Sequence, residues 1–169
     1  MSQPESVRRA AAVLIVDDHA PMREAMRVCI ERAFPDLSVI EAPDGAIALE
    51  VVKENCPCLV LMDINLPDAN GLDLTRDILK QWPRTFVAVI SIDTSMELSE
   101  YAKAAGALEL IGKDDLFRTL LPLVGAAVTL NNMMKGLTSL TEGMAQSPQY
   151  GSQHAAHLVR TDVLPAGQA

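Results

Sequence analysis

Five short aliphatic runs recur along the chain, and each is separated from the next by a segment with helical spacing of apolar residues. Three of the runs are apolar at nearly every position, which is typical of strands that are covered on both faces in a parallel sheet. Alternation of such strands with helices predicts an α/β layer fold with right-handed crossovers. The runs are Val13–Val16, Leu37–Ile40, Leu59–Met62, Phe86–Ile90 and Leu108–Ile111.

The segments between these runs carry helix signals at their ends. Pro21 suits the first turn of a helix over Pro21–Ala33, where a missing N–H costs nothing. Asp44 is a suitable cap for the next helix, and Gly106 is a suitable residue after the end of the fourth. Together the signals predict five strand–helix units and a doubly wound, five-stranded parallel sheet. The remaining predicted helices are Leu72–Lys80, Met96–Ala105 and one that begins at Asp114-Asp115.

The chain has 169 residues, 49% of them apolar, and a net charge of −8. This length suits one domain, predicted over 12–131, with an N-terminal extension of 1–11. The C-terminal extension, 132–169, is rich in Gln, Ser, Gly and Ala, and we expect it to be largely disordered. The segment Leu120–Leu137 also fits an extension of the fifth helix, either kinked or started afresh at Pro122. The longest apolar tract, Leu120–Leu130, is too short to cross a bilayer, so a soluble, cytoplasmic protein without membrane contact is expected.

Polar residues stand where the predicted strands end. Asp17 and Asp18 follow the first strand, Asp63 the third, Ser91 the fourth and Lys113 the fifth. The ends of parallel strands share one edge, where ligands of such sheets bind. Crowded carboxylates repel one another, and an open site of few oxygen ligands favours Mg²⁺. A lysine and a hydroxyl beside that ion suggest a phosphoryl group, and the chain has no P-loop, so Asp63 is the candidate nucleophile for an aspartyl phosphate.

In four blocks the sequence resembles the response-regulator receiver domains of bacterial two-component signalling. The blocks, which lie within about residues 12–125, are "LIVDDHAPMR", "LVLMDINLPDANGLDL", "VISIDT" and "GALELIGKDD". The resemblance implies the flavodoxin-like (βα)5 receiver fold. It also implies that Asp63 accepts phosphate from a histidine kinase or a histidine phosphotransfer protein, as a switch rather than an enzyme, with at most slow self-catalysed phosphorylation and dephosphorylation.

Roles for the neighbouring residues follow from the same resemblance. Asp18 would bind Mg²⁺ directly, Asp17 partly through water, and the backbone carbonyl of Asn65 would be a further ligand. Ser91 and Lys113 would bind the phosphoryl group. Pro67 and Gly71 would shape the loop after Asp63, and a positive φ is expected at Gly71. The face formed by the fourth helix, fifth strand and fifth helix would then change its protein contacts.

Two residues depart from the family pattern. Leu110 stands where a Tyr or Phe commonly swings inward on activation, which puts the usual coupling to Ser91 in doubt. Ile92 stands where Ala or Gly is frequent, and its branched side chain is expected to hinder access to Asp63 or to lengthen the lifetime of the phosphoryl group. These departures keep open a second reading, in which the chain is a phosphate-independent binding module.

Other readings of the same residues carry less weight. A phosphohydrolase of the aspartyl-phosphate type would need an acid at position 65, where this chain has Asn65. His19 is expected to be a solvated loop residue, and His154 and His157 lack a third metal ligand. No basic helix follows the domain, so we expect a stand-alone regulator that does not bind DNA. Its expected partner is a downstream protein target, and a homodimer is possible. The alternative is a receiver part of a transcription regulator that lacks its output domain.

Overall fold

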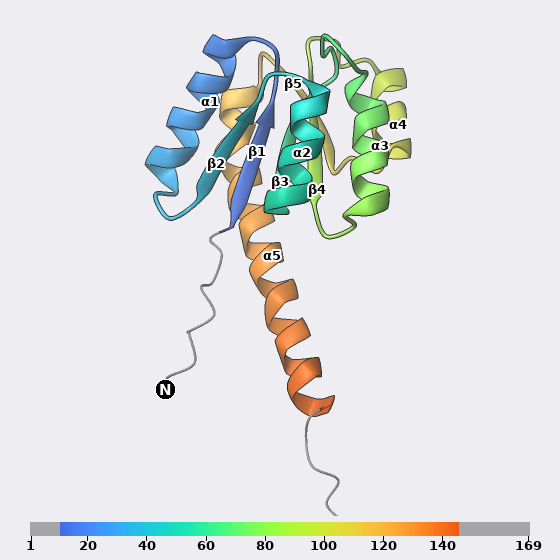
Figure 1. The fold of residues 1–169 in the computed structure, drawn as a ribbon. Helices are drawn as coiled ribbons and strands as arrows, with labels where there is room; N and C mark the ends of the chain where they lie inside the picture. Colours follow the sequence, from blue (N-terminus) through green and yellow to red (C-terminus); the bar gives the residue numbers. More distant parts are fainter. Residues whose placement is uncertain (1–10, 146–169) are drawn as a thin grey trace, which may run out of the picture. The chain divides into compact units, whose positions relative to one another are not determined.

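The computed structural model describes residues 11–145, and in this part of the chain five parallel strands form one sheet flanked by five helices (Figure 1). The doubly wound fold predicted from the sequence is therefore confirmed. In chain order the elements are β1 (Ala12–Val16), α1 (Ala20–Ala33), β2 (Ser38–Ala42), α2 (Gly45–Asn55), β3 (Leu59–Asp63), α3 (Gly71–Gln81), β4 (Phe86–Ser91), α4 (Met96–Ala104), β5 (Glu109–Gly112) and α5 (Leu116–Ala145).

The strand order in the sheet is β2-β1-β3-β4-β5, and all neighbouring strands are parallel. The chain first winds outward from β1 to β2 and then returns to β3 on the other side of β1. The order therefore reverses between β1 and β3, and the crevice at the carboxyl ends of these two strands is where doubly wound sheets bind ligands. Asp17 follows β1 and Asp63 ends β3 at this edge.

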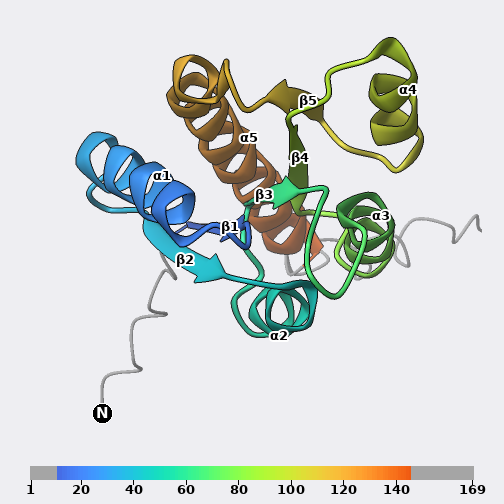
Figure 2. The same cartoon turned by 90° about the horizontal axis from the view of Figure 1, so that it is seen from above.

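Helices cover both faces of the sheet (Figure 2). Helices α1 and α5 pack on one face, and α2 and α3 pack on the other. The strands β1 and β3 are buried at every position, so their side chains fill both apolar layers. Burying a side chain such as Leu14 or Ile15 stabilises the fold by about 1.5–3 kcal/mol.

The predicted helix ends are largely as the structure has them. The side chain of Asp44 caps α2 by accepting a hydrogen bond from the Ile47 N–H at 2.8 Å. Gly106 follows α4 with φ +92°, a conformation that glycine adopts without strain. Helix α5 runs without interruption through Pro122, so the helix does not start afresh at this proline.

The prediction of a positive φ at Gly71 is wrong. Among the described residues Gly106 is the glycine with positive φ, and Gly71 is the first residue of α3. Glycine is required at position 71 for space instead. A Cβ there would lie 2.1 Å from the carbonyl oxygen of Asp63 and 2.8 Å from the Cα of Ile64. The start of α3 thus packs directly on the end of β3.

The chain divides into two compact units after Met134. In the second unit the described residues, 135–145, are helical and form the end of α5. Helix α5 thus extends beyond Leu137 to Ala145, into the extension that was expected to be largely disordered. Residues 146–169 lie outside the described residues, and the domain boundary at 131 stays a prediction. No helix within 11–145 is both long enough and apolar enough to span a membrane.

Candidate functional site

Three carboxylates meet at the carboxyl ends of β1 and β3. Each of Asp17, Asp18 and Asp63 offers an oxygen, and these oxygens all lie within 4.8 Å of one another. Asp17 and Asp63 are buried, whereas Asp18 is exposed. The cluster follows from the parallel pairing of β1 with β3, which sets Val16 opposite Met62 and so brings the residues after them together.

Lys113, which follows the carboxyl end of β5, forms ion pairs with two of these acids. Its ammonium Nζ lies 2.8 Å from Oδ2 of Asp63 and 3.0 Å from Oδ2 of Asp17. The lysine side chain is only 20% exposed, so water screens these ion pairs weakly. The sequence separates Lys113 from Asp63 by 50 residues, and the sheet brings them into contact.

Burial disfavours the charged forms of Asp63 and Lys113, and the contact between these two residues favours them. Burial raises the pKa of Asp63, and the nearby charge of Asp17 raises it further; the hydrogen bond and charge of Lys113 oppose this but do not cancel it. For Lys113, burial alone would lower the pKa, but the hydrogen bonds to Asp63 and Asp17 outweigh it and raise the pKa. Lys113 therefore stays charged, while ionisation of Asp63 is costly.

The donor set fits a hard divalent cation. If all three acids are ionised, Lys113 compensates only one of their charges, and two negative charges remain. Carboxylate oxygens are the ligands that Mg²⁺ prefers, and a site with few protein ligands leaves room for its waters and for a phosphate. Nitrogen and sulfur ligands, which softer metals prefer, are not part of the cluster. Asp17, Asp18 and Asp63 are thus suited to hold Mg²⁺.

Of the remaining predicted site residues, Asn65 lies in the loop that follows β3 and Ser91 is the last residue of β4. The backbone N–H of Asn65 faces Oδ1 of Asp63 at 3.4 Å, and a short bridge pairs Asn65 with Asn70. Ser91 is buried; its hydroxyl accepts a hydrogen bond from the Asp93 N–H at 3.1 Å, and its carbonyl accepts one from the Lys113 N–H at 2.8 Å. The roles of the Asn65 carbonyl and of the Ser91 hydroxyl stay predictions.

Arg23 supports the cluster and was not singled out from the sequence. Its guanidinium donates a hydrogen bond to the backbone carbonyl of Asp17 at 2.6 Å and pairs with Glu41 on β2 at 3.2 Å. The side chain is 14% exposed, so this contact fixes the β1–α1 connection from within. The available signal was an arginine in the first turns of the helix after the acid pair, which lies close to that connection.

The residues that depart from the family pattern lie around the same edge of the sheet. Ile92 follows Ser91 and is 82% exposed, and Leu110 on β5 is half-buried beside Val89. His19 is exposed, as predicted, and its backbone N–H donates to Asp17. His154 and His157 lie outside the described residues. The effects of Ile92 and Leu110 on switching stay predictions.

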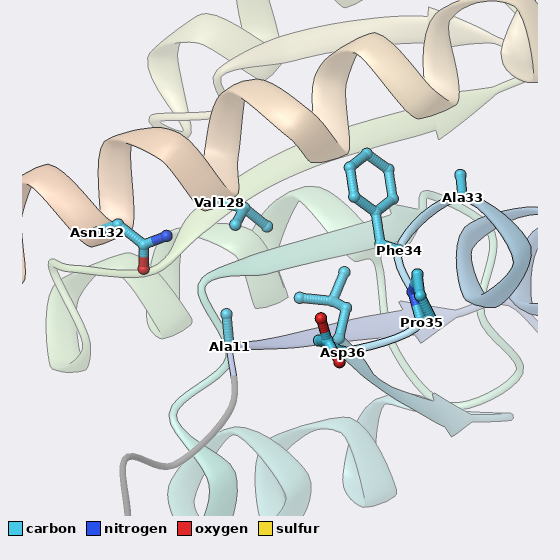
Figure 3. A pocket seen from close by; sticks show the side chains of 8 residues that line it. Ala11, Ala33, Phe34, Pro35, Asp36, Val128 and Asn132 are labelled. Carbon is cyan, nitrogen blue, oxygen red and sulfur yellow. The ribbon is translucent and has the colours of Figure 1, made fainter.

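A cavity of about 360 Å³ lies elsewhere (Figure 3). It is lined by Phe34 from the α1–β2 connection, by Val128 and Asn132 from α5, and by Ala11, which precedes β1. These residues mark the amino ends of β1 and β2, whereas Asp17 and Asp63 lie at the carboxyl ends. The cavity is therefore separate from the acid cluster.

Comparison with known proteins identifies the receiver domain as the shared part. A family model described as "Response regulator receiver domain" matches residues 13–124. The chain is 33% identical over 96 residues to the transcriptional regulatory protein DegU of Brevibacillus brevis, covering 56% of this chain and 40% of that protein. It is 35% identical over 111 residues to a protein-glutamate methylesterase/protein-glutamine glutaminase of Pyrococcus horikoshii, covering 62% of this chain and 29% of that protein.

Solved structures agree with these matches. A response regulator receiver domain protein (CheY-like) from Methanospirillum hungatei has a TM-score of 0.68 at 25% identity, over 74% of this chain and 98% of that one. A LuxR-family two-component response regulator from Aurantimonas sp. has a TM-score of 0.65 at 29% identity, over 71% and 86% of the two chains. The chain spans less than half the length of the two curated relatives, so the whole activities of those proteins do not transfer to it.

Proposed function

Because the chain belongs to the response regulator receiver domain family, we propose that it is a phosphorylation-controlled switch whose phosphoacceptor is Asp63. The observation that carries the proposal is the contact of the Lys113 ammonium with Asp63 at 2.8 Å, inside a cluster of three acids that suits Mg²⁺. The donor would be a histidine kinase or a histidine phosphotransfer protein. Asp17, Asp18, Asp63 and the carbonyl of Asn65 would hold the ion.

The transfer needs no general base on this chain, because the ionised carboxylate is itself the nucleophile. An oxygen of Asp63 forms a bond to phosphorus, the P–N bond of the donor phosphohistidine breaks, and the bonding electrons leave with the imidazole. Lys113 neutralises charge on the phosphoryl oxygens as they approach the acids. Bound Mg²⁺ supplies further charge neutralisation and orients the phosphoryl group.

Phosphorylation would act through Ser91 at the end of β4 and Lys113 after the end of β5. The phosphoryl group adds negative charge and acceptor oxygens, so these two residues bind the phosphorylated form better and shift the equilibrium toward it. Ser91 precedes α4 and Lys113 precedes α5, and both helices and the segment before β5 carry exposed apolar side chains. Such side chains suit contact with a protein partner; they are Met96, Tyr101, Leu108 and Phe117.

Incubation with acetyl phosphate and Mg²⁺, followed by intact-mass measurement, tests the phosphoacceptor. Wild-type protein should gain one phosphoryl adduct, and Asp63→Asn should gain none. Asp73→Asn is a matched control, because Asp73 is exposed on α3 and pairs with Arg76 on the same helix. An adduct that persists in Asp63→Asn, or no adduct in wild type, contradicts the proposal.

A phosphate-independent binding module is the second candidate function. The observation in its favour is Leu110, which gives β5 no aromatic ring to couple with Ser91. A pull-down with and without beryllofluoride, which mimics the phosphoryl group, separates the two candidates. Capture of the same partners in equal amounts favours the second candidate, and capture that depends on beryllofluoride favours the switch.

A further inference from the structure

Asp68 joins two elements that the sequence keeps far apart. It lies in the connection between β3 and α3, yet its carboxylate accepts hydrogen bonds from the first two backbone N–H groups of α2. Oδ1 lies 2.8 Å from the Gly45 nitrogen, and Oδ2 lies 2.9 Å from the Ala46 nitrogen. Since Asp44 takes the next N–H, that of Ile47, the first turn of α2 is satisfied partly from a loop 23 residues further along the chain.

The chemistry of this contact favours an ionised carboxylate. A helix N-terminus presents unpaired N–H groups and a partial positive charge, and two parallel acceptors match two neighbouring N–H groups. The hydrogen bond from Gly45 is the main cause that lowers the pKa of Asp68. The two segments also approach closely, because a Cβ on Gly45 would lie 3.1 Å from the Cβ of Ala69.

The loop held by Asp68 is the one that follows the phosphoacceptor. Its base is closed by the bridge between Asn65 and Asn70 and by the Gly71 N–H, which donates to the Ile64 carbonyl at 2.8 Å. Its tip is held by Asp68. The backbone of Asn65, whose N–H faces Asp63, belongs to this base and lies three residues before Asp68. Figure 2 shows this loop passing beside the start of α2.

We propose that Asp68 is a positioning residue: by tying the loop after β3 to the N-terminus of α2, it holds the backbone of Asn65 in place beside Asp63. Asp68 does not touch the acid cluster, so it acts through the loop. Loss of this contact at the start of α2 would let the Asn65 backbone move and so weaken Mg²⁺ binding. The inference rests on the proposed function, because it assigns the loop a part in Mg²⁺ binding and phosphoryl uptake.

Two substitutions in the full chain test the hydrogen bonds between Asp68 and the start of α2. Asp68→Ala removes both acceptors, and Asp68→Asn retains one acceptor oxygen; Asp73→Asn is the control on the neighbouring helix. The dissociation constant for Mg²⁺ is measured from the thermal shift at increasing Mg²⁺. We expect Asp68→Ala to weaken Mg²⁺ binding by about tenfold, as for residues that orient metal ligands, and Asp68→Asn to weaken it less.

Hydrogen exchange provides a readout that does not depend on the ion. In Asp68→Ala the amides of Gly45 and Ala46 should exchange faster, and so should the amide of Gly71 at the base of the loop. If Gly45 and Ala46 lose protection while Gly71 and the Mg²⁺ dissociation constant match the Asp73→Asn control, Asp68 is only a helix cap and the inference is overturned. Failure of the proposed function is distinct, because it appears as absence of a phosphoryl adduct in wild type.

Discussion

Substituting Gly71 by alanine puts a methyl group against the backbone of Asp63. The added Cβ would lie 2.1 Å from the carbonyl oxygen of Asp63, 2.9 Å from its carbonyl carbon and 2.8 Å from the Cα of Ile64. All three are backbone atoms, and Asp63 and Ile64 are held by pairing with Ile90. Relief therefore requires the start of α3 to move away from the end of β3.

The size of the effect follows from the distance. Real Cβ atoms keep at least 3.0 Å from other heavy atoms, so the contact with the Asp63 oxygen is too short by 0.9 Å. Overpacking costs about 1–3 kcal/mol where side chains can adjust, and a clash with backbone belongs at the upper end of that range, about 3 kcal/mol. For a chain of this size that loss lowers Tm by roughly 10 °C.

Urea unfolding monitored by Trp82 fluorescence measures this loss, because Trp82 is the single tryptophan and is half-buried against the layer that α3 covers. The matched control is Gly125→Ala within α5, where the new Cβ would meet only the ring of Phe34 at 3.6 Å. That variant should be stabilised by about 1 kcal/mol through helix propensity. A Gly71→Ala variant as stable as wild type would refute the steric argument.

A third variant distinguishes a steric clash of the Cβ at position 71 from a requirement for positive φ there. Asparagine tolerates a positive φ far better than alanine does, so Gly71→Asn would be clearly more stable than Gly71→Ala if a positive φ were the reason for glycine. Under the steric argument the two variants lose similar amounts of free energy of unfolding, because both carry the same Cβ.

Three further predictions concern the acid cluster. Burial and the charge of Asp17 raise the pKa of Asp63, although Lys113 opposes them. The folded protein therefore holds the Asp63 proton more tightly than the unfolded chain does. Without Mg²⁺, the free energy of unfolding should thus fall as pH rises from the ordinary pKa of an aspartate through the raised one. Asp63→Asn should abolish that fall in urea titrations across this pH window, and an unchanged profile would contradict it. Lys113→Met should cost about 3 kcal/mol of stability by urea unfolding, because it leaves Asp17 and Asp63 buried without their counter-charge. Mg²⁺ at 100 times its dissociation constant should add about 2.7 kcal/mol to the stability of wild type, and chelation should reverse the gain; Asp18→Asn should require more Mg²⁺ for the same thermal shift.

The fold was predictable because its signals are local and repeated. Continuous apolar runs identify the buried strands β1, β3 and β4, and Asp44 and Gly106 mark helix ends through their own backbone chemistry. The gathering of Asp17, Asp63 and Lys113 was predictable for a related reason. Once the strands are parallel, the residues after them must share one edge, whatever their separation in sequence.

What the sequence did not reveal depends on contacts that have no local signature. Gly71 was expected to adopt an unusual φ, but its requirement comes from a strand end that packs against it. Aspartate is common in turns, so the sequence gives no reason to single out Asp68. Its contact with α2 depends on the path of the β3–α3 loop. The sequence left the end of the fifth helix open, because Leu120–Leu137 fits a helix whereas the composition from residue 143 onward resembles a linker; α5 extends to Ala145.

The charges of the acid cluster limit how phosphorylation of Asp63 could produce a switch. A phosphoryl group adds negative charge to a cluster of three acids, two of which already share Lys113. In the proposed switch, Mg²⁺, Lys113 and the Ser91 hydroxyl would offset this added charge. Ser91 and Lys113 are joined through their backbones by a hydrogen bond of 2.8 Å, and they precede α4 and α5. In the proposed switch, a displacement of either residue would reach the first turns of α4 and α5, where Met96 and Phe117 lie exposed.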